Sequence, residues 1–198
     1  MLFRSWFLGG ETGHALAGVL TGKINPSGKL PVTFPKKLAD NPTYKFYPGG
    51  LEAEYREDLL VGYRWYDAED IEPLFPFGHG LSYTQFSLED LMVRKEGDLW
   101  RVTVTLRNIG AVTGAEVVQL YLEMPRSTGE PVRQLKGFQR VQLEPGKQQE
   151  VSFVLAEDDL SFWDGQEKQW RVADGTYRIH VGHSSRNLPL SASFRLES

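Results

Sequence analysis

The sequence predicts a mainly β protein, an immunoglobulin-like sandwich preceded by a partial α/β segment and long loops. Three observations support this. Short alternating stretches of apolar and polar residues fill the chain beyond residue 85, a strand–turn–helix pattern opens it, and a rigid aromatic stretch separates the two. We therefore divide the 198 residues into a remnant of an α/β layer (1–40), connecting loops with a packed hinge (41–84), and a sandwich (85–198).

The first region carries a strand–helix–strand pattern. Leu2 to Leu8 is mostly apolar and predicts a buried strand, which Gly9-Gly10 ends. Gly13 to Leu20 places its apolar residues at helical spacing, and Gly22 is well placed to end that helix. Leu30 to Phe34 predicts a short extended segment.

Residues 36–70 show weak periodicity and many aromatic side chains, which predicts loops without regular elements. Pro73–Thr84 instead combines prolines and glycines that fix turns with the aromatic and apolar side chains of Phe75, Phe77, Leu81 and Tyr83. We expect a packed hinge that buries these four side chains and holds His79 as a hydrogen-bonded residue. The hinge residues are Phe75, Phe77, Gly78, His79, Gly80 and Tyr83.

Beyond the hinge the pattern changes to period two, which is typical of half-buried strands. Turn signals such as Glu144–Lys147 and Asp174-Gly175 separate the strands. About seven strands are expected, the number found in immunoglobulin-like sandwiches. They are Ser87–Val93, Trp100–Arg107, Ala115–Leu122, Leu135–Leu143, Val151–Leu155, Tyr177–Val181 and Leu188–Leu196.

Composition excludes several classes of protein. The formal net charge of −4 argues against a phosphate-binding surface, so nucleic acid is not an expected partner. The absence of cysteine removes disulfides, thiol nucleophiles and thiolate metal sites. No apolar run is long enough for a membrane span, and the N-terminus lacks the features of a signal peptide. We expect no cofactor and leave the compartment open, with the cytoplasm slightly favoured.

A few residues are candidates for a site. Glu11 lies on a glycine-rich turn where α/β proteins bind ligands, although a carboxylate also favours a helix N-terminus for structural reasons. Arg64, Trp65 and Tyr66 could line a sugar subsite or anchor a loop on the hinge, and we favour the structural interpretation for both candidates. His180 and His183 are not expected to bind a metal. The acidic cluster Glu157–Asp159 is expected to be a solvated turn.

Several stretches form long, specific motifs. They are Trp6–Gly22, Asn25–Pro35, Leu60–Asp67, Phe75–Thr84, Glu116–Tyr121, Leu135–Phe138 and Val181–Ser185. Together they resemble glycoside hydrolase family 3, the β-glucosidase family, in which a stretch like Phe75–Thr84 joins an α/β sandwich domain to a C-terminal fibronectin type III-like domain. Two positions depart from the family pattern, since Leu8 stands where proline is common and Asp58 where glycine is frequent.

The resemblance implies a parent enzyme that hydrolyses terminal β-D-glucosyl residues with retention. It also implies an Asp nucleophile in an N-terminal (β/α)8 barrel and a Glu acid/base in the α/β domain upstream of this chain. Neither motif occurs here, so we assign no catalytic residue. The chain alone is expected to be inactive, with the sandwich in a stabilising role.

The expected partners follow from the incomplete first region. One strand, one helix and one short strand cannot form a closed α/β layer. Its apolar side chains are expected to pack on the missing barrel and α/β domain, or on another copy of the chain. These side chains are Leu2, Phe3, Trp6, Phe7, Leu16, Val19 and Leu20.

Two alternatives stay open. The chain could be a subunit of a split enzyme that complements a separate barrel. It could also be a freestanding, non-catalytic module that binds carbohydrate or protein. The second alternative needs exposed aromatic side chains, for which Trp100, Trp163 and Trp170 are the candidates. Trp100, however, belongs to the core pattern, and the other two are typical of loop or edge packing.

Overall fold

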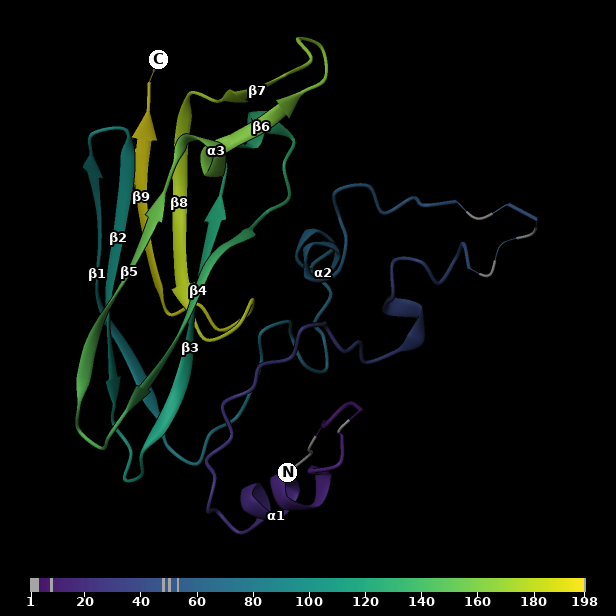
Figure 1. Cartoon of the computed structure of the whole chain (residues 1–198). Coiled ribbons are helices and arrows are strands. Elements are labelled where there is room, and N and C mark those ends of the chain that lie inside the picture. The colour runs from purple at the N-terminus through teal and green to yellow at the C-terminus, as the bar shows by residue number, and fades with distance from the viewer. Residues whose placement is uncertain (1–3, 8, 48, 50, 53, 198) are drawn as a thin grey trace.

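The structure, a computed structural model, describes residues 4–7, 9–47, 49, 51–52 and 54–197. Two facing β-sheets form a sandwich, and the chain that precedes them runs along one side of it as an irregular arm with short helices (Figure 1). We call residues 4–84 the N-terminal arm. Its elements are α1 (Thr12–Leu20), the 3₁₀ turn η1 (Leu38–Asp40) and α2 (Tyr63–Ala68).

The sandwich confirms the seven predicted strands, each of which belongs to one of two antiparallel sheets. The three-stranded sheet has the order β1–β2–β5 and the four-stranded sheet the order β4–β3–β8–β9. Irregularities in register occur at Glu89/Met92 on β1 and at Leu120/Tyr121 on β3. The strands are β1 (Phe86–Glu96), β2 (Leu99–Asn108), β3 (Gly114–Glu123), β4 (Gln134–Leu143), β5 (Gln148–Leu155), β8 (Gly175–Gly182) and β9 (Leu190–Leu196).

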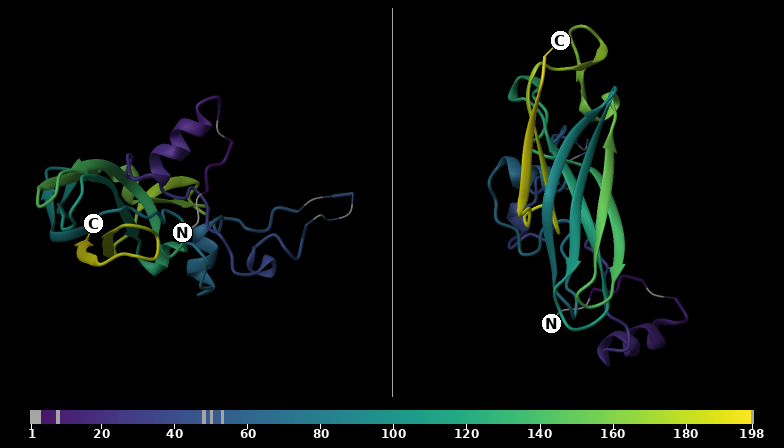
Figure 2. Two further views of the ribbon diagram at one scale, coloured as in Figure 1. Left: turned by 90° about the horizontal axis from the view of Figure 1, so that it is seen from below. Right: turned by 90° about the vertical axis from the view of Figure 1, so that its left-hand side faces the viewer.

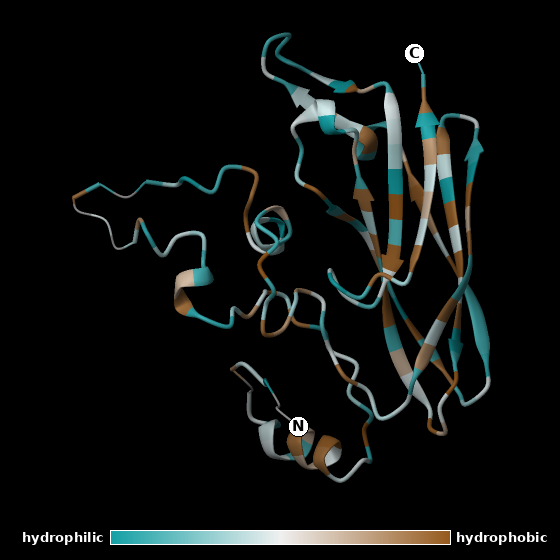
Figure 3. Ribbon diagram, turned by 180° about the vertical axis from the view of Figure 1, so that it is seen from behind, coloured by the Kyte–Doolittle hydropathy of each residue, from teal (hydrophilic) through white to brown (hydrophobic). Residues whose placement is uncertain are grey.

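The core lies between the two sheets, as the alternation of apolar and polar residues along the strands requires (Figure 3). On β2 the side chains of Val102, Val104 and Leu106 are buried, whereas their neighbours Arg101 and Thr103 are only partly covered. Each fully buried aliphatic side chain contributes about 1.5–3 kcal/mol. Trp100 belongs to this core, as predicted, with its ring centroid 3.9 Å from that of Phe194 on the far sheet.

Two features between β5 and β8 were not predicted. A hairpin of β6 (Ser161–Asp164) and β7 (Gln169–Val172) forms its own two-stranded sheet. The acidic cluster is not a solvated turn but the short helix α3 (Glu157–Leu160). The carboxylate of Asp159 accepts a hydrogen bond from the backbone N–H of Ala156 at 3.0 Å, and this contact fixes the start of the helix. A further 3₁₀ turn, η2 (Arg126–Thr128), follows β3.

The N-terminal arm differs more from expectation. The predicted helix is confirmed as α1, which is followed by Gly22 at φ +75°. The prediction of a strand at Leu2–Leu8 is wrong for residues 4–7, which have no regular structure. Phe7 in this stretch is fully exposed. Leu2, Phe3 and Leu8 lie outside the described residues. Without a neighbouring strand, the backbone there has no ladder partner. Of Leu30–Phe34, only Phe34 forms a β-bridge, with Phe75 of the hinge.

Residues 36–70 contain η1 and α2, so the prediction that they lack regular elements is wrong there. The helix α2 begins after Gly62, which has φ +64°, and it buries Tyr66 against the rest of the protein. Its amphipathic pattern is too short to stand out in the sequence. Between η1 and α2 the chain projects away from the sandwich (Figure 2). No helix within the described ranges is long and apolar enough to span a membrane.

The hinge is only partly packed. Phe75 and Phe77 are half-buried, but Leu81 and Tyr83 are 56% and 37% exposed, so the expectation that they are buried is wrong. Tyr83 makes a polar contact instead, because its hydroxyl donates to the backbone oxygen of Val19 at 2.8 Å. The hinge thereby connects the end of α1 to the start of β1.

Candidate functional site

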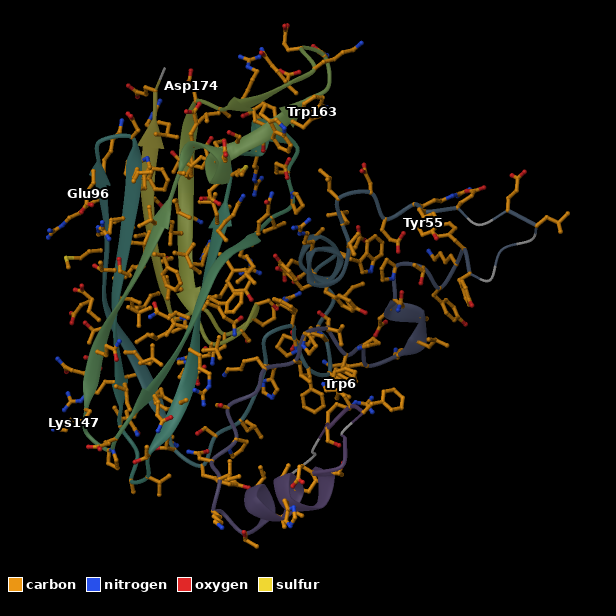
Figure 4. The ribbon with its side chains drawn as sticks, viewed as in Figure 1. Trp6, Tyr55, Glu96, Lys147, Trp163 and Asp174 are labelled. Carbon is orange, nitrogen blue, oxygen red and sulfur yellow. The ribbon has the colours of Figure 1, made fainter. Side chains whose placement is uncertain are left out.

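The N-terminal arm meets the sandwich over one continuous contact surface, which we call the junction. The arm contributes residues 25–34 and 63–84, and the sandwich contributes β3, the chain leading into β4 and the turn after β8. Side chains crowd the space between α2 and the four-stranded sheet (Figure 4). The polar groups of the junction form three clusters.

The first cluster is centred on Asp67 at the end of α2, whose side chain is 1% exposed. Its two carboxylate oxygens lie 2.8 Å from Nε of Arg186 and 3.0 Å from Nη2 of Arg133. Arg186 also donates from Nη2 to the backbone oxygens of Tyr66 at 2.8 Å and Ile71 at 3.1 Å. Two guanidinium groups from the sandwich thus hold the last turn of α2 and the chain after it.

The second cluster is centred on Gln119 of β3, which is 3% exposed. Its side-chain Nε2 donates to the backbone oxygens of Gly78 at 3.1 Å and His183 at 2.8 Å, and its Oε1 accepts from the Tyr121 hydroxyl at 2.7 Å. Gly78 has φ +77°, and a Cβ there would overlap the Gln119 amide. The close approach of hinge and strand therefore depends on this glycine.

The third cluster is centred on Glu116 of β3. Glu116 Oε1 lies 2.6 Å from Nζ of Lys29 and 3.6 Å from Nδ1 of His183, and all three side chains are largely buried. Burial alone would raise the pKa of Glu116, but the contacts with His183 and Lys29 outweigh it and hold that pKa below its ordinary value. Burial and the nearby Lys29 charge lower the pKa of His79, whose ring stacks on Phe75 with centroids 5.4 Å apart.

Aromatic contacts complete the junction. The ring of Tyr63 stacks on Phe77 at 4.9 Å and meets Tyr121 edge-on at 5.8 Å between centroids. The Tyr63 hydroxyl accepts a hydrogen bond from the backbone N–H of Leu135 at 2.8 Å. Desolvation in this environment raises the pKa of Tyr121. Closer to α1, Asn25 joins the arm to the β2–β3 loop, because its side-chain amide donates to the backbone oxygen of Thr113 at 3.0 Å.

Six of the sequence motifs supply these contacts. Each of them places at least one residue in the junction: Asn25–Pro35, Leu60–Asp67, Phe75–Thr84, Glu116–Tyr121, Leu135–Phe138 and Val181–Ser185. The backbone between motifs is joined as well, since Ser185 N–H donates to Phe77 O at 3.0 Å. The arrangement carries ion pairs and buried amides, the contacts by which two parts of a protein are fixed relative to each other.

The predicted site residues lie in two separate places, Glu11 beside α1 and the other three on α2. Glu11 is exposed beside α1, where its carboxylate contacts His14 Nδ1 at 2.7 Å and makes no helix-capping hydrogen bond. On α2, Arg64 Nη1 donates to Leu59 O at 3.4 Å and Trp65 Nε1 to Asp40 O at 3.2 Å. Tyr66 is 4% exposed and offers no free ring face to a sugar. Glu11 directly precedes α1, which lies apart from α2 in the structure (Figure 1).

The two histidines considered as metal ligands bind different carboxylates. His180 Nε2 lies 3.0 Å from Glu123, whereas His183 faces Glu116. Within the part of the chain that the structure describes, no group of three or more His, Asp or Glu residues could hold a metal ion.

An open cleft of about 770 Å³ lies between the end of α1 and the β2–β3 loop. It is lined by Leu20, Thr21, Gly22, Lys23, Asn25, Tyr83, Val112 and Thr113, so no carboxylate lines it. Glycoside hydrolysis by a pair of carboxyl groups therefore has no basis in this cleft.

Sequence reasoning missed the residues that hold the junction together, namely Lys29, Asp67, Gln119, Arg133 and Arg186. Four of them carry charge and Gln119 an amide, and three lie inside the motifs named above. Their place within the motifs was the available signal, but each of their partners lies far away in the sequence.

A sandwich held against a preceding arm by ion pairs and buried amides defines a class of protein, one with an immunoglobulin-like module fixed behind a second structural unit. Comparison with known proteins makes this specific. Residues 2–83 match the glycosyl hydrolase family 3 C-terminal domain, and residues 116–185 match the fibronectin type III-like domain. The chain thus belongs to glycoside hydrolase family 3 and corresponds to the C-terminal part of its β-glucosidases.

Individual relatives agree. The chain is 46% identical, over 97% of its length, to thermostable β-glucosidase B of Acetivibrio thermocellus. A family 3 β-glucosidase of Bifidobacterium adolescentis superimposes on 98% of the chain with a TM-score of 0.93 at 39% identity, and β-glucosidase 3B of Thermotoga neapolitana on 98% with 0.92 at 41%. The chain spans only about a quarter of these proteins, covering 26%, 29% and 28% of them respectively.

Proposed function

We propose that this chain works as the C-terminal part of a β-glucosidase that hydrolyses terminal β-D-glucosyl residues with retention. Residues 1–40 complete an α/β domain, residues 41–84 connect it, and residues 85–198 form a sandwich with a stabilising role. The nucleophile and the acid/base belong to a barrel and to an α/β domain outside these 198 residues. The observation that carries this proposal is the junction, because the motifs shared with the family meet there and form fixing contacts.

The exposed surface of the arm supports a large partner. Trp6 is 55% exposed, Leu20 66% and Phe7 fully exposed, although aromatic and aliphatic groups of this size favour burial. The remaining domains of the enzyme would cover this surface. Glu11, Arg64 and Trp65 would then be the residues of this chain nearest to the substrate rim, and none of them serves as nucleophile or acid/base.

A chimera tests the proposal. The C-terminal quarter of the Acetivibrio thermocellus enzyme is replaced by this chain, and hydrolysis of an aryl β-glucoside is measured. We expect the chimera to be active, and the chain alone and the chimera with only residues 85–198 to be inactive. A folded but inactive full chimera would contradict the proposal, as would turnover by the chain alone that is abolished by Glu11→Gln.

A further inference from the structure

The β6–β7 hairpin is a second unusual surface, and the junction does not involve it. It lies at the end of the sandwich opposite to α1 (Figure 1). Near the base of the hairpin, Phe162 and Val172 pack against the core. Closer to the turn, Trp163 and Trp170 face each other as direct cross-strand partners.

The two tryptophans contribute little to the core. Their ring centroids are 5.7 Å apart at 69°, an edge-to-face contact that holds the pair in a fixed geometry. Even so, Trp163 is 51% and Trp170 67% exposed, whereas Trp100 in the core is 9% exposed. Neither indole N–H has a hydrogen-bond partner among the described residues, unlike that of Trp65, which donates to Asp40. Two rigid ring faces and two free donors therefore remain available to a ligand.

The groups around the pair are polar and balanced in charge. Asp164 accepts hydrogen bonds from the backbone N–H groups of Gln166 and Glu167 at 2.9 and 3.1 Å, and its other oxygen lies 3.0 Å from Nη1 of Arg171. These contacts order the turn. Across residues 161–172 the charges of Asp164 and Glu167 cancel those of Lys168 and Arg171. Such a surface suits a neutral ligand and does not attract an anionic or cationic polymer.

We propose that Trp163 and Trp170 form a binding site for a neutral oligosaccharide. The C–H face of a pyranose ring is apolar and packs on an indole, and the hydroxyl groups at its rim hydrogen-bond to amides and charged side chains. The hairpin carries two exposed amide side chains of this kind, on Gln166 in the turn and on Gln169 of β7. The choice of a β-glucan chain as the sugar rests on the proposed function.

The test uses the whole chain and cellohexaose, with ¹H–¹⁵N spectra of its five tryptophan indoles. We expect the indole signals of Trp163 and Trp170 to shift in a saturable way and those of Trp6 and Trp65 to stay in place. Trp163→Ala or Trp170→Ala should weaken binding about tenfold or more, Trp170→Phe should weaken it less, and Trp6→Ala, at an exposed indole elsewhere, should leave it unchanged.

Three outcomes would overturn the site: no shift at either indole, shifts confined to other tryptophans, or equal binding by the alanine variants. The site would also be reassigned if the chain self-associated in a concentration-dependent way and Trp170→Ala abolished this association. The ligand of the two tryptophans would then be a second copy of the chain and not a sugar. Because binding is read from the chain itself and hydrolysis from the chimera, the two proposals can fail separately.

Discussion

Removing the charge of Asp67 should release α2 from the sandwich. In Asp67→Asn, the two guanidinium groups of Arg133 and Arg186 lose their shared counter-charge, although the amide keeps the shape of the side chain. These arginine side chains are only 20% and 23% exposed, so water compensates them poorly. Removing one partner of a buried ion pair costs about 3–5 kcal/mol. Burial raises the pKa of Asp67 despite the two arginines, so the buried charge is stabilised less than its two ion pairs alone suggest, and we expect the lower end of that range.

Native-state hydrogen exchange measures this effect locally. The amides of Glu69 and Ile71 donate to Trp65 O and Tyr66 O, and they are protected only while the last turn of α2 is in place. A loss of about 3 kcal/mol corresponds to exchange about 10²-fold faster at these amides. Amides in the centre of β3 should change much less, because the sandwich core does not depend on Asp67.

A matched control lies three residues away. Asp70 is fully exposed and 4.0 Å from Nη1 of Arg186, so Asp70→Asn removes the same charge without uncovering a buried pair. We expect it to leave the exchange of Glu69 and Ile71 unchanged. Equal rates in wild type and Asp67→Asn, or equal effects of the two substitutions, would refute the reasoning.

Three further predictions concern the junction. Gln119→Leu should lower the free energy of unfolding, measured by urea denaturation, by about 1–3 kcal/mol, because it leaves the backbone oxygens of Gly78 and His183 without a donor. A loss no larger than that of Gln139→Leu, at an exposed position, would contradict this. Gly78→Ala should lower the free energy of unfolding more than Gly146→Ala in the same assay. Both glycines have positive φ, but only at Gly78 would an added Cβ meet a side chain, that of Gln119. Equal losses would show that this contact is unimportant. The pKa of His79 lies below the ordinary 6.5, so the unfolded chain binds more protons than the folded one, and stability should fall as the pH drops from about 6.5 toward the folded-state pKa. The melting temperature of His79→Gln should therefore fall less steeply over this range than that of the wild type, whereas the exposed His14→Gln should not show this change. Parallel melting curves for His79→Gln and the wild type would exclude the effect.

The sequence predicted the sandwich well because each of its strands buries one face. On β2, alternation of Val102, Val104 and Leu106 with polar residues is required by the pleat, whatever lies on the other side. The β6–β7 hairpin broke this rule, since Trp163 and Trp170 are large apolar residues on an exposed surface. The arm was predicted less well because its structure depends on contacts with other segments and not on local periodicity.

The candidate site shows the same division. The motifs marked which stretches matter, but nothing in the sequence paired Asp67 with Arg133 and Arg186 or Gln119 with Gly78. Such pairs join positions far apart in the chain, and a single sequence carries no information on which distant polar groups meet. Tyr66 illustrates the resulting error, since an aromatic residue beside Arg64 and Trp65 suggested a sugar subsite and proved to be buried.

The contact of Arg186 with the α2 carbonyl of Tyr66 spans 120 positions of sequence, and this has a consequence during synthesis. At about 5–20 residues per second, a ribosome needs about 6–24 s to travel from one to the other. Throughout that interval the end of α2 lacks this contact, so the emerging arm is more open to chaperones and to incorrect association. Final assembly of the arm therefore waits for the turn after β8, and a stop codon placed shortly before Arg186 would leave a nearly full-length polypeptide that is unable to complete it.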